Sequence, residues 1–386
     1  MGILAGIDEA GYGPHLGPLV VAAAAFEFDA APLPDPDLWQ SLAPHVTKQP
    51  SRHAAGVVIC DSKVAYTSGG RLATLERTVL GFLAAAGRRP RTFAQLLDAV
   101  AVRPCADGGA AAQAPWETPE SIALPVDASA GEIDAAAEHL ARGLAGIGGR
   151  PAGLWVNTAS AARLNGLMDG RRNKAGALFT LAADLLGEVL RRGAAAPMYC
   201  VSYGGASQTG WHGHAPLRDH VPGTASGPSL RHGHATARDH ATPQRLTQYG
   251  PVHVAMDRHG GRRYYADMLS GAFPMTTVEA VEESPTLSRY RLLHGGPATG
   301  DAEAGAVTLT VRERCEEAST ATALASMAAK YVRELAMRQL NAYFQERVPG
   351  LRATAGYGLD AWRFLDDIAT ARAAMGVPDA AILRSR

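Results

Sequence analysis

Apolar residues gather in short continuous runs that predict strands. Residues 3–28 hold two such runs joined by a turn rich in glycine and proline, as expected for two neighbouring buried strands. A similar run spans 252–256, and 307–311 alternates between apolar and polar residues as a half-buried strand does. The segment 277–293 has the pattern of a hairpin.

Longer segments repeat apolar residues at the period of a helix. They are residues 71–87, 133–144, 175–192, 319–344 and 360–375. Pro349 and Gly350 end the longest of them, because proline cannot continue a helix. Strands followed by helices, with one crossover, predict an α/β fold in which a mixed sheet is flanked by helices. We expect a single domain over residues 1–386, with long insertions and a helical C-terminal region from about residue 319.

The segment 202–250 has a different composition from the rest of the chain. It is rich in Gly, Ser, Thr and Pro and contains six histidines: His212, His214, His220, His232, His234 and His240. These histidines could form a zinc or nickel site. The missing apolar periodicity favours a flexible polar insertion instead.

The composition excludes several classes of protein. The formal net charge of the 386 residues is zero, so no global positive field attracts nucleic acid. The four cysteines are far apart and form no C-x-x-C pair, which argues against a thiolate zinc site and favours a reducing compartment. No stretch approaches the ~20 apolar residues that a membrane span needs, and no signal peptide is visible. We expect a cytoplasmic protein without membrane contact, and the sequence predicts no protein partner.

Candidate chemistry begins at the end of the first predicted strand. Asp8 and Glu9 are adjacent there and precede the turn Gly11-Tyr12-Gly13. Two buried carboxylates are costly unless a cation compensates them. The sequence therefore predicts a cation site within its first ten residues.

Two further acids are candidates for the same site. Asp257 ends a predicted strand as Asp8 does, so their carboxylates meet if the two strands are neighbours. Glu334 lies four residues after Lys330 and eight after Ser326, so the three residues share one face of the long predicted helix. Four carboxylates without His or Cys are hard oxygen ligands, which suit Mg²⁺ or Mn²⁺.

Five short motifs, in this order along the chain, resemble those of type 2 ribonucleases H, the ribonuclease HII and HIII family. They are the stretch from Gly6 to Ala22 with its Asp-Glu pair, Asp61-Ser62-Lys63, Met256-Asp257, the helix Ala325-Ser326…Ala329-Lys330…Arg333-Glu334, and Gly356-Tyr357-Gly358. The ordered set is far more specific than any single motif. The resemblance covers about a quarter of the chain.

The resemblance implies a ribonuclease H-like fold and hydrolysis of RNA in RNA–DNA hybrids, or at ribonucleotides embedded in DNA. It implies a two-metal-ion mechanism with Mg²⁺ or Mn²⁺, in which Asp8, Glu9, Asp257 and Glu334 are the catalytic and metal-binding residues. Substrate contacts are implied for Gly11, Tyr12, Gly13, Lys63, Lys330 and Tyr357. The products would carry 5′-phosphate and 3′-hydroxyl ends.

The chain departs from the family pattern at two of these positions. Glu334 stands where the family usually has Asp, and Tyr12 replaces a basic residue common in ribonuclease HII. An alternative is therefore a catalytically silent hybrid-binding protein with the same fold. A dinucleotide-binding site is disfavoured, because the glycine fingerprint requires glycine at position 16, which is leucine here.

Overall fold

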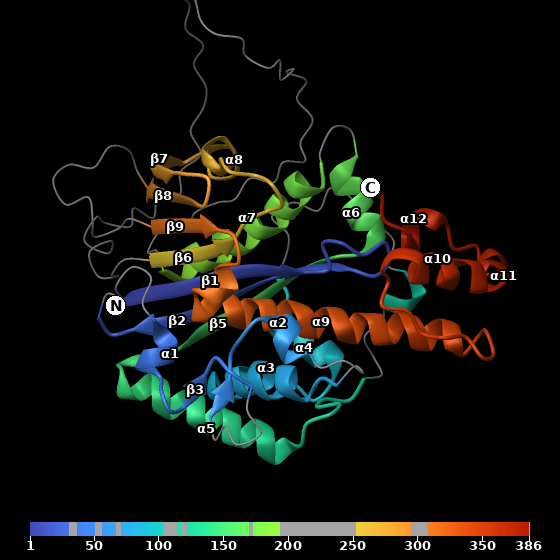
Figure 1. Ribbon diagram of the computed structural model, residues 1–386, viewed down its shortest axis with the longest axis horizontal. Helices are drawn as coiled ribbons and strands as arrows, with labels where there is room; N and C mark the ends of the chain where they lie inside the picture. The colour runs from blue at the N-terminus through green and yellow to red at the C-terminus, as the bar shows by residue number, and fades with distance from the viewer. Residues whose placement is uncertain are drawn as a thin grey trace, which may run out of the picture.

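The computed structural model describes residues 1–30, 37–50, 56–66, 71–102, 114–117, 122–169, 173–193, 252–294 and 307–385 (Figure 1). The histidine-rich segment 202–250 lies outside these residues, and so does the prediction of a flexible insertion there. Among the described helices, none has both the length and the apolar character needed to cross a bilayer.

A seven-stranded mixed sheet organises the molecule. From one edge to the other its strands are β5 (Gly149–Ala159), β2 (Leu19–Phe28), β1 (Gly2–Ala10), β6 (Val252–Asp257), β9 (Val307–Arg312), β8 (Leu287–His294) and β7 (Thr276–Glu283). β1 runs antiparallel to β2 and parallel to β6, and β6 runs parallel to β9. Ile7 pairs with Met256, so Asp8 and Asp257 follow at the same edge of the sheet.

Helices cover both faces of this sheet (Figure 1). One face packs against α9 (Thr320–Gln345), α3 (Ala73–Ala85) and α5 (Ala130–Gly146), and the other packs against α7 (Lys174–Gly193) and α8 (Ala266–Ala272). Each face of the sheet has its own hydrophobic core, because successive side chains of β1 point to opposite faces. Leu4 belongs to the core with α9, and its neighbours Ile3 and Ala5 belong to the core with α7. The predicted α/β fold, a mixed sheet flanked by helices, is confirmed.

Gly6 lets α9 approach the sheet closely. A Cβ atom at Gly6 would lie 2.0 Å from the backbone nitrogen of Thr322, in the first turn of α9. The start of α9 therefore lies directly against the middle of β1, and Ser326 lies one turn further along the same helix.

The remaining elements are short or peripheral. They are α1 (Leu38–Ser41), β3 (Val46–Thr47), β4 (Val57–Val58), α2 (Ser62–Ala65), α4 (Phe93–Val100), η1 (Pro115–Glu117), α6 (Ala161–Met168), η3 (Cys315–Glu317), α10 (Gly358–Asp367), α11 (Ala369–Ala374) and α12 (Asp379–Ile382). The predicted hairpin at 277–293 is confirmed as β7 and β8. The predicted last helix, 360–375, is instead two helices that meet at Ile368. The helix predicted at 133–144 begins earlier, because Ser129 and Glu132 form a capping box.

Candidate metal centre

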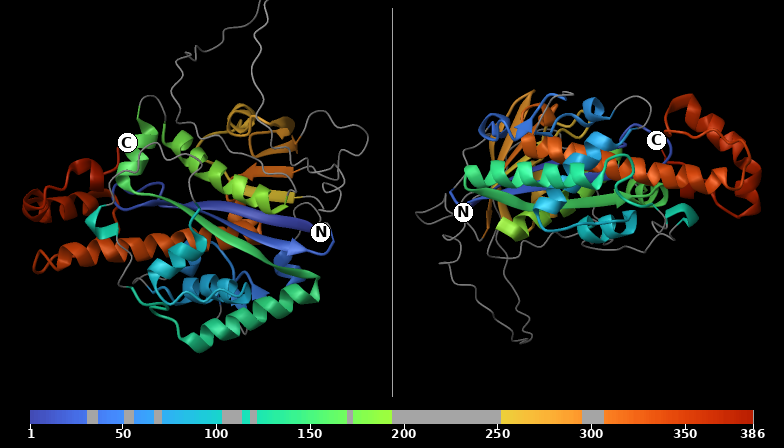
Figure 2. Two further views of the ribbon diagram at one scale, coloured as in Figure 1. Left: turned by 180° about the vertical axis from the view of Figure 1, so that it is seen from behind. Right: turned by 90° about the horizontal axis from the view of Figure 1, so that it is seen from below.

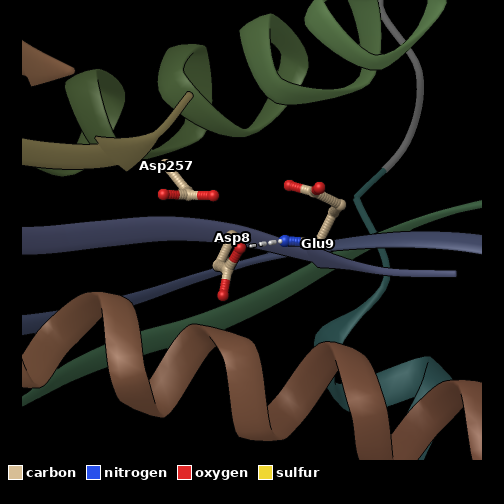
Figure 3. Close-up of side chains that lie close together, drawn as sticks. All are labelled: Asp8, Glu9 and Asp257. Carbon is tan, nitrogen blue, oxygen red and sulfur yellow. Dashed lines mark hydrogen bonds between the residues drawn. The ribbon is translucent and has the colours of Figure 1, made fainter. Parts of the chain in front are cut away.

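The ends of β1 and β6 bring three carboxylates together (Figure 3). Each of Asp8, Glu9 and Asp257 offers an oxygen that lies within 4.8 Å of the oxygens of the other two. The backbone N–H of Glu9 donates a hydrogen bond of 2.7 Å to Oδ1 of Asp8, which orients that carboxylate. The structure thus unites three of the four predicted acids.

Burial makes this arrangement costly without a cation. Burial raises the pKa of the Asp8 carboxyl well above its usual value, and the charges of Glu9 and Asp257 raise it further. A hydrogen bond from Ser326 opposes this shift in the pKa of Asp8. Burial also raises the pKa of Glu9 to about 8, and the charges of Asp257 and Glu316 add to the effect. A bound divalent cation would offset the repulsion between these carboxylates, which contributes to the raised pKa values of Asp8 and Glu9.

Glu316 is a further acid close to this cluster, and the sequence patterns did not predict it. It lies in η3, just before α9, and is only 8% exposed. Its charge raises the pKa values of both Asp8 and Glu9, and its own pKa is raised by burial and then by the charge of Asp257. Its Oε2 atom is buried without a hydrogen-bond partner. A buried carboxylate oxygen that lacks a donor and lies near other acids is suited to bind a cation.

The structure does not bring Glu334 to this cluster. Glu334 follows Ser326 by eight residues, or about 12 Å along the helix axis. Its carboxylate accepts hydrogen bonds from the Tyr66 hydroxyl (3.0 Å) and from Nζ of Lys330 (2.6 Å). Lys330 also lies over the Tyr66 ring, 4.3 Å from its centroid. Glu334 and Lys330 therefore form a pair with each other, away from the three acids.

Lys63 is a positive group close to the acids. Its charge lowers the pKa values of Glu9, Asp257 and Glu316, against the effect of their burial. The Asp61 side chain accepts a hydrogen bond of 2.8 Å from the backbone N–H of Lys63 and so begins the short helix α2. Lys63 therefore lies near the acids, and its implied contact with substrate stays a prediction.

The glycine turn and Tyr357 lie side by side next to the acids. Gly11 has a φ of 90°, a conformation that favours glycine. A Cβ atom at Gly13 would lie 3.8 Å from Cε1 of Tyr357, whose side chain is 48% exposed. The backbone N–H of His15 donates to the carbonyl of Gly356 (2.8 Å), which joins the two segments. An exposed aromatic ring thus stands beside a turn with accessible backbone.

The donor set fits Mg²⁺ or Mn²⁺ and does not fit a soft metal. Within the described residues, the metal-ligand cluster consists of Asp8, Glu9 and Asp257 and contains no His or Cys, and the charge of Glu316 acts on two of these acids. Hard divalent cations prefer such oxygen ligands. Two observations favour a bound cation: the cluster of three carboxylates and the buried Oε2 atom of Glu316, which has no hydrogen-bond partner.

Comparison with known proteins gives no match by sequence and several similar structures, two of which are compared with this chain below. No protein family matches the chain, and no curated protein is similar to it. One structure is described as the PCNA:RNase HII complex from Archaeoglobus fulgidus; it is 13% identical over 100% of this chain and 94% of that chain, with a TM-score of 0.35. The other is ribonuclease H2 from Pyrococcus horikoshii OT3, 10% identical over 98% and 92% of the two chains, also with a TM-score of 0.35. Similarity at this level assigns no activity, so the residues of this chain must carry the functional argument.

Proposed function

We propose that this protein is a metal-dependent endoribonuclease, a ribonuclease H. It hydrolyses the RNA strand of RNA–DNA hybrids, or the phosphodiester at a ribonucleotide embedded in duplex DNA. The convergence of Asp8, Glu9 and Asp257 at one edge of the sheet is the observation that carries this proposal. When bound, Mg²⁺ or Mn²⁺ ions would activate water and stabilise the negative charge of the reacting phosphate.

The residues of the chain have distinct roles in this proposal. Asp8, Glu9 and Asp257 hold the cations, and Glu316 replaces Glu334 as the fourth carboxylate, since the charge of Glu316 acts on both Asp8 and Glu9. Lys63 lies near the same acids and stabilises the negative charge of the phosphate.

Recognition of RNA depends on the 2′-hydroxyl group, which DNA lacks. In this proposal the backbone of the turn Gly11-Tyr12-Gly13 contacts this hydroxyl, and the exposure of Gly13 supports that role. Tyr357 offers an exposed ring on which the adjacent sugar or base can stack. Glu334 and Lys330 fix the orientation of Tyr66 and contact no substrate in this proposal.

Cleavage of a duplex that carries a single ribonucleotide tests the proposal. We expect cleavage with Mg²⁺ or Mn²⁺, none in EDTA, and none of an all-DNA duplex of the same sequence. Asp8→Asn should abolish the reaction, whereas Glu317→Gln should preserve it, because the Glu317 side chain is exposed and pairs with Arg314. Binding of the duplex without products, in the presence of either metal, would instead support a catalytically silent hybrid-binding protein.

A further inference from the structure

A pocket of about 820 Å³ opens beside the glycine turn, outside the cluster of acids. Its lining includes Tyr12 from the turn, Asn165 from α6, Lys174 at the start of α7, and Ser385 near the end of the chain. Tyr12 lines the pocket, and burial and the charge of Glu9 raise the pKa of its hydroxyl, so this tyrosine is also near one of the acids. A ligand that extends from the catalytic site past Tyr12 would enter this pocket.

The C-terminal segment builds one wall of the pocket. Asn165 donates hydrogen bonds to the carbonyls of Leu383 (2.9 Å) and Ala380 (3.2 Å) and accepts one from the backbone N–H of Ser385 (2.7 Å). Figures 1 and 2 show the C-terminus beside α6 in each view. The pocket is thus a built feature, held by hydrogen bonds between residues distant in the sequence.

Lys174 gives the pocket a positive charge, and no carboxylate in the described part of the chain pairs with it. Its Nζ lies 5.0 Å from the centroid of the Tyr12 ring. Within the described parts of the chain, no carboxylate lies within ion-pair distance of Lys174, and the exposed Asp169 on the lining forms no such pair with it. Burial and the charge of Arg384 lower the pKa of Lys174, which shows that a second cation is close.

Two buried arginines extend this positive charge beneath the turn. Arg384 is 3% exposed; it donates to the carbonyls of Gly17 (2.7 Å) and Gly11, and its Nη2 atom has no hydrogen-bond partner. Arg333 is 1% exposed, and its charge is the second cause, after burial, of the lowered pKa of Arg384, which is about 9. Arg333 is paired with Glu334 at 3.7 Å, whereas no carboxylate of the described residues lies within ion-pair distance of Arg384. Burial of a cation without such a partner is costly, and an anion bound near Arg384 would offset that cost.

We propose that this pocket binds one nucleotide of the bound duplex, with its backbone phosphate against Lys174. The proposal rests on the proposed function, since it assumes a nucleic-acid substrate. A pocket of this volume accommodates a sugar and a phosphate, and Met168, Ala162 and Ala380 offer apolar surface to the sugar. Lys174 contacts the phosphate, and Arg384 strengthens the field from behind without direct contact.

Duplex binding in EDTA tests this proposal without requiring turnover. We compare Lys174→Gln with Arg192→Gln, a variant that removes an exposed cation over the ring of Trp155 at the other end of the same helix. Lys174→Gln removes one phosphate contact and should weaken duplex binding roughly tenfold at 0.1 M salt. It should also reduce the slope of log binding constant against log salt concentration by about one unit. Arg192→Gln should match the wild type, and Lys174→Arg should retain most of the affinity.

Neutral methylphosphonate linkages, placed one at a time along each strand, locate the contact. If Lys174 contacts one phosphate, Lys174→Gln should cause no further loss of affinity for the duplex in which that phosphate is replaced. For duplexes with the neutral linkage at any other position, the loss caused by the linkage and the loss caused by Lys174→Gln should add. Additive losses at every position, or equal affinities for Lys174→Gln and Arg192→Gln, would overturn the proposal. Thermal melting of each variant confirms that it is folded. Because binding is measured without metal, a protein that binds but never cleaves would refute only the proposed activity.

Discussion

The backbone N–H of Cys315 donates a hydrogen bond of 3.0 Å to Oδ1 of Asp257. This bond fixes η3 to the end of β6 and therefore places Glu316, the residue after Cys315, near enough for its charge to act on Asp8 and Glu9. Arg314 precedes it with a φ of 53°, the left-handed conformation that reverses the chain after β9. The end of β6 thus carries Asp257 and also anchors η3, the segment that contains Glu316.

Glu316→Gln and Glu334→Gln should have unequal effects on turnover. Removal of the Glu316 charge should lower kcat by roughly 10²-fold or more, the effect typical of a group that acts electrostatically at the reacting centre. Glu334→Gln should reduce it less than about tenfold, because Glu334 binds Tyr66 and Lys330 instead of the acid cluster. Single-turnover cleavage with saturating Mn²⁺ measures both. A larger loss in Glu334→Gln would restore Glu334 as the fourth carboxylate.

Glu9→Gln should stabilise the metal-free protein, and more at high pH than at low pH. A carboxyl with a raised folded-state pKa binds its proton more tightly when folded, so its contribution to stability is lost as pH rises through that pKa, about 8 for Glu9. Removing this charge should raise the free energy of unfolding by about 1–3 kcal/mol at pH 8.5 and by less at pH 5.5. Urea unfolding in EDTA gives the values. If Glu9→Gln were less stable than the wild type at pH 8.5, the prediction would be wrong, and the negative charge of Glu9 would not destabilise the metal-free protein.

His259 should make the protein sensitive to acid. Burial lowers its pKa to about 3, and its Nδ1 atom has no hydrogen-bond partner. The unfolded chain binds a proton at His259 below about pH 6.5, whereas the folded protein does not until about pH 3, so stability falls across that range. His259→Phe should abolish this contribution, which amounts to about 2 kcal/mol at pH 5. Phe suits the site because the rings of Phe179 and Tyr265 surround it.

The control for this prediction is the difference between wild type and His259→Phe at pH 7.5, where neither state of the wild type is protonated at this residue. Parallel profiles of unfolding free energy from pH 7.5 to pH 5 would contradict the assignment of the acid sensitivity to His259.

Two glycine substitutions should have opposite effects on stability. A Cβ at Gly6 would overlap the backbone of Thr322, which cannot move without displacing α9, so Gly6→Ala should cost about 3 kcal/mol or more. Nothing lies within 4 Å of a Cβ at Gly131, in the first turn of α5, and Gly131→Ala should stabilise by up to about 1 kcal/mol. Thermal melting compares the two. Equal Tm values for wild type and Gly6→Ala would contradict the close packing of α9 on β1.

Much of the sheet and three of the acids could be predicted from the sequence. The runs at 3–28 and 252–256 are apolar enough to specify buried strands, and two acids at parallel strand ends meet at one edge by geometry alone. Glu316 could not be found this way, because η3 is too short to show any periodicity. Its signal was a charged pair, Glu316-Glu317, just before the cap of the long helix.

Glu334 shows the limit of helical spacing as evidence. Residues i, i+4 and i+8 share a face, but they extend over two turns. Ser326 interacts with Asp8 at the end of β1, whereas the Glu334 carboxylate binds Lys330. The pocket at Lys174 depends on contacts between α6 and the C-terminal segment, which no local pattern in the sequence reveals.

Calorimetric titration of Mn²⁺ into the protein at pH 8 tests the central claim most directly, that these carboxylates form a divalent-cation site. We predict saturable binding in the wild type, a loss of affinity of at least tenfold in Asp257→Asn, and no change in Glu317→Gln. Identical titrations of wild type and Asp257→Asn would contradict the account, because the acids at the ends of β1 and β6 would then hold no cation.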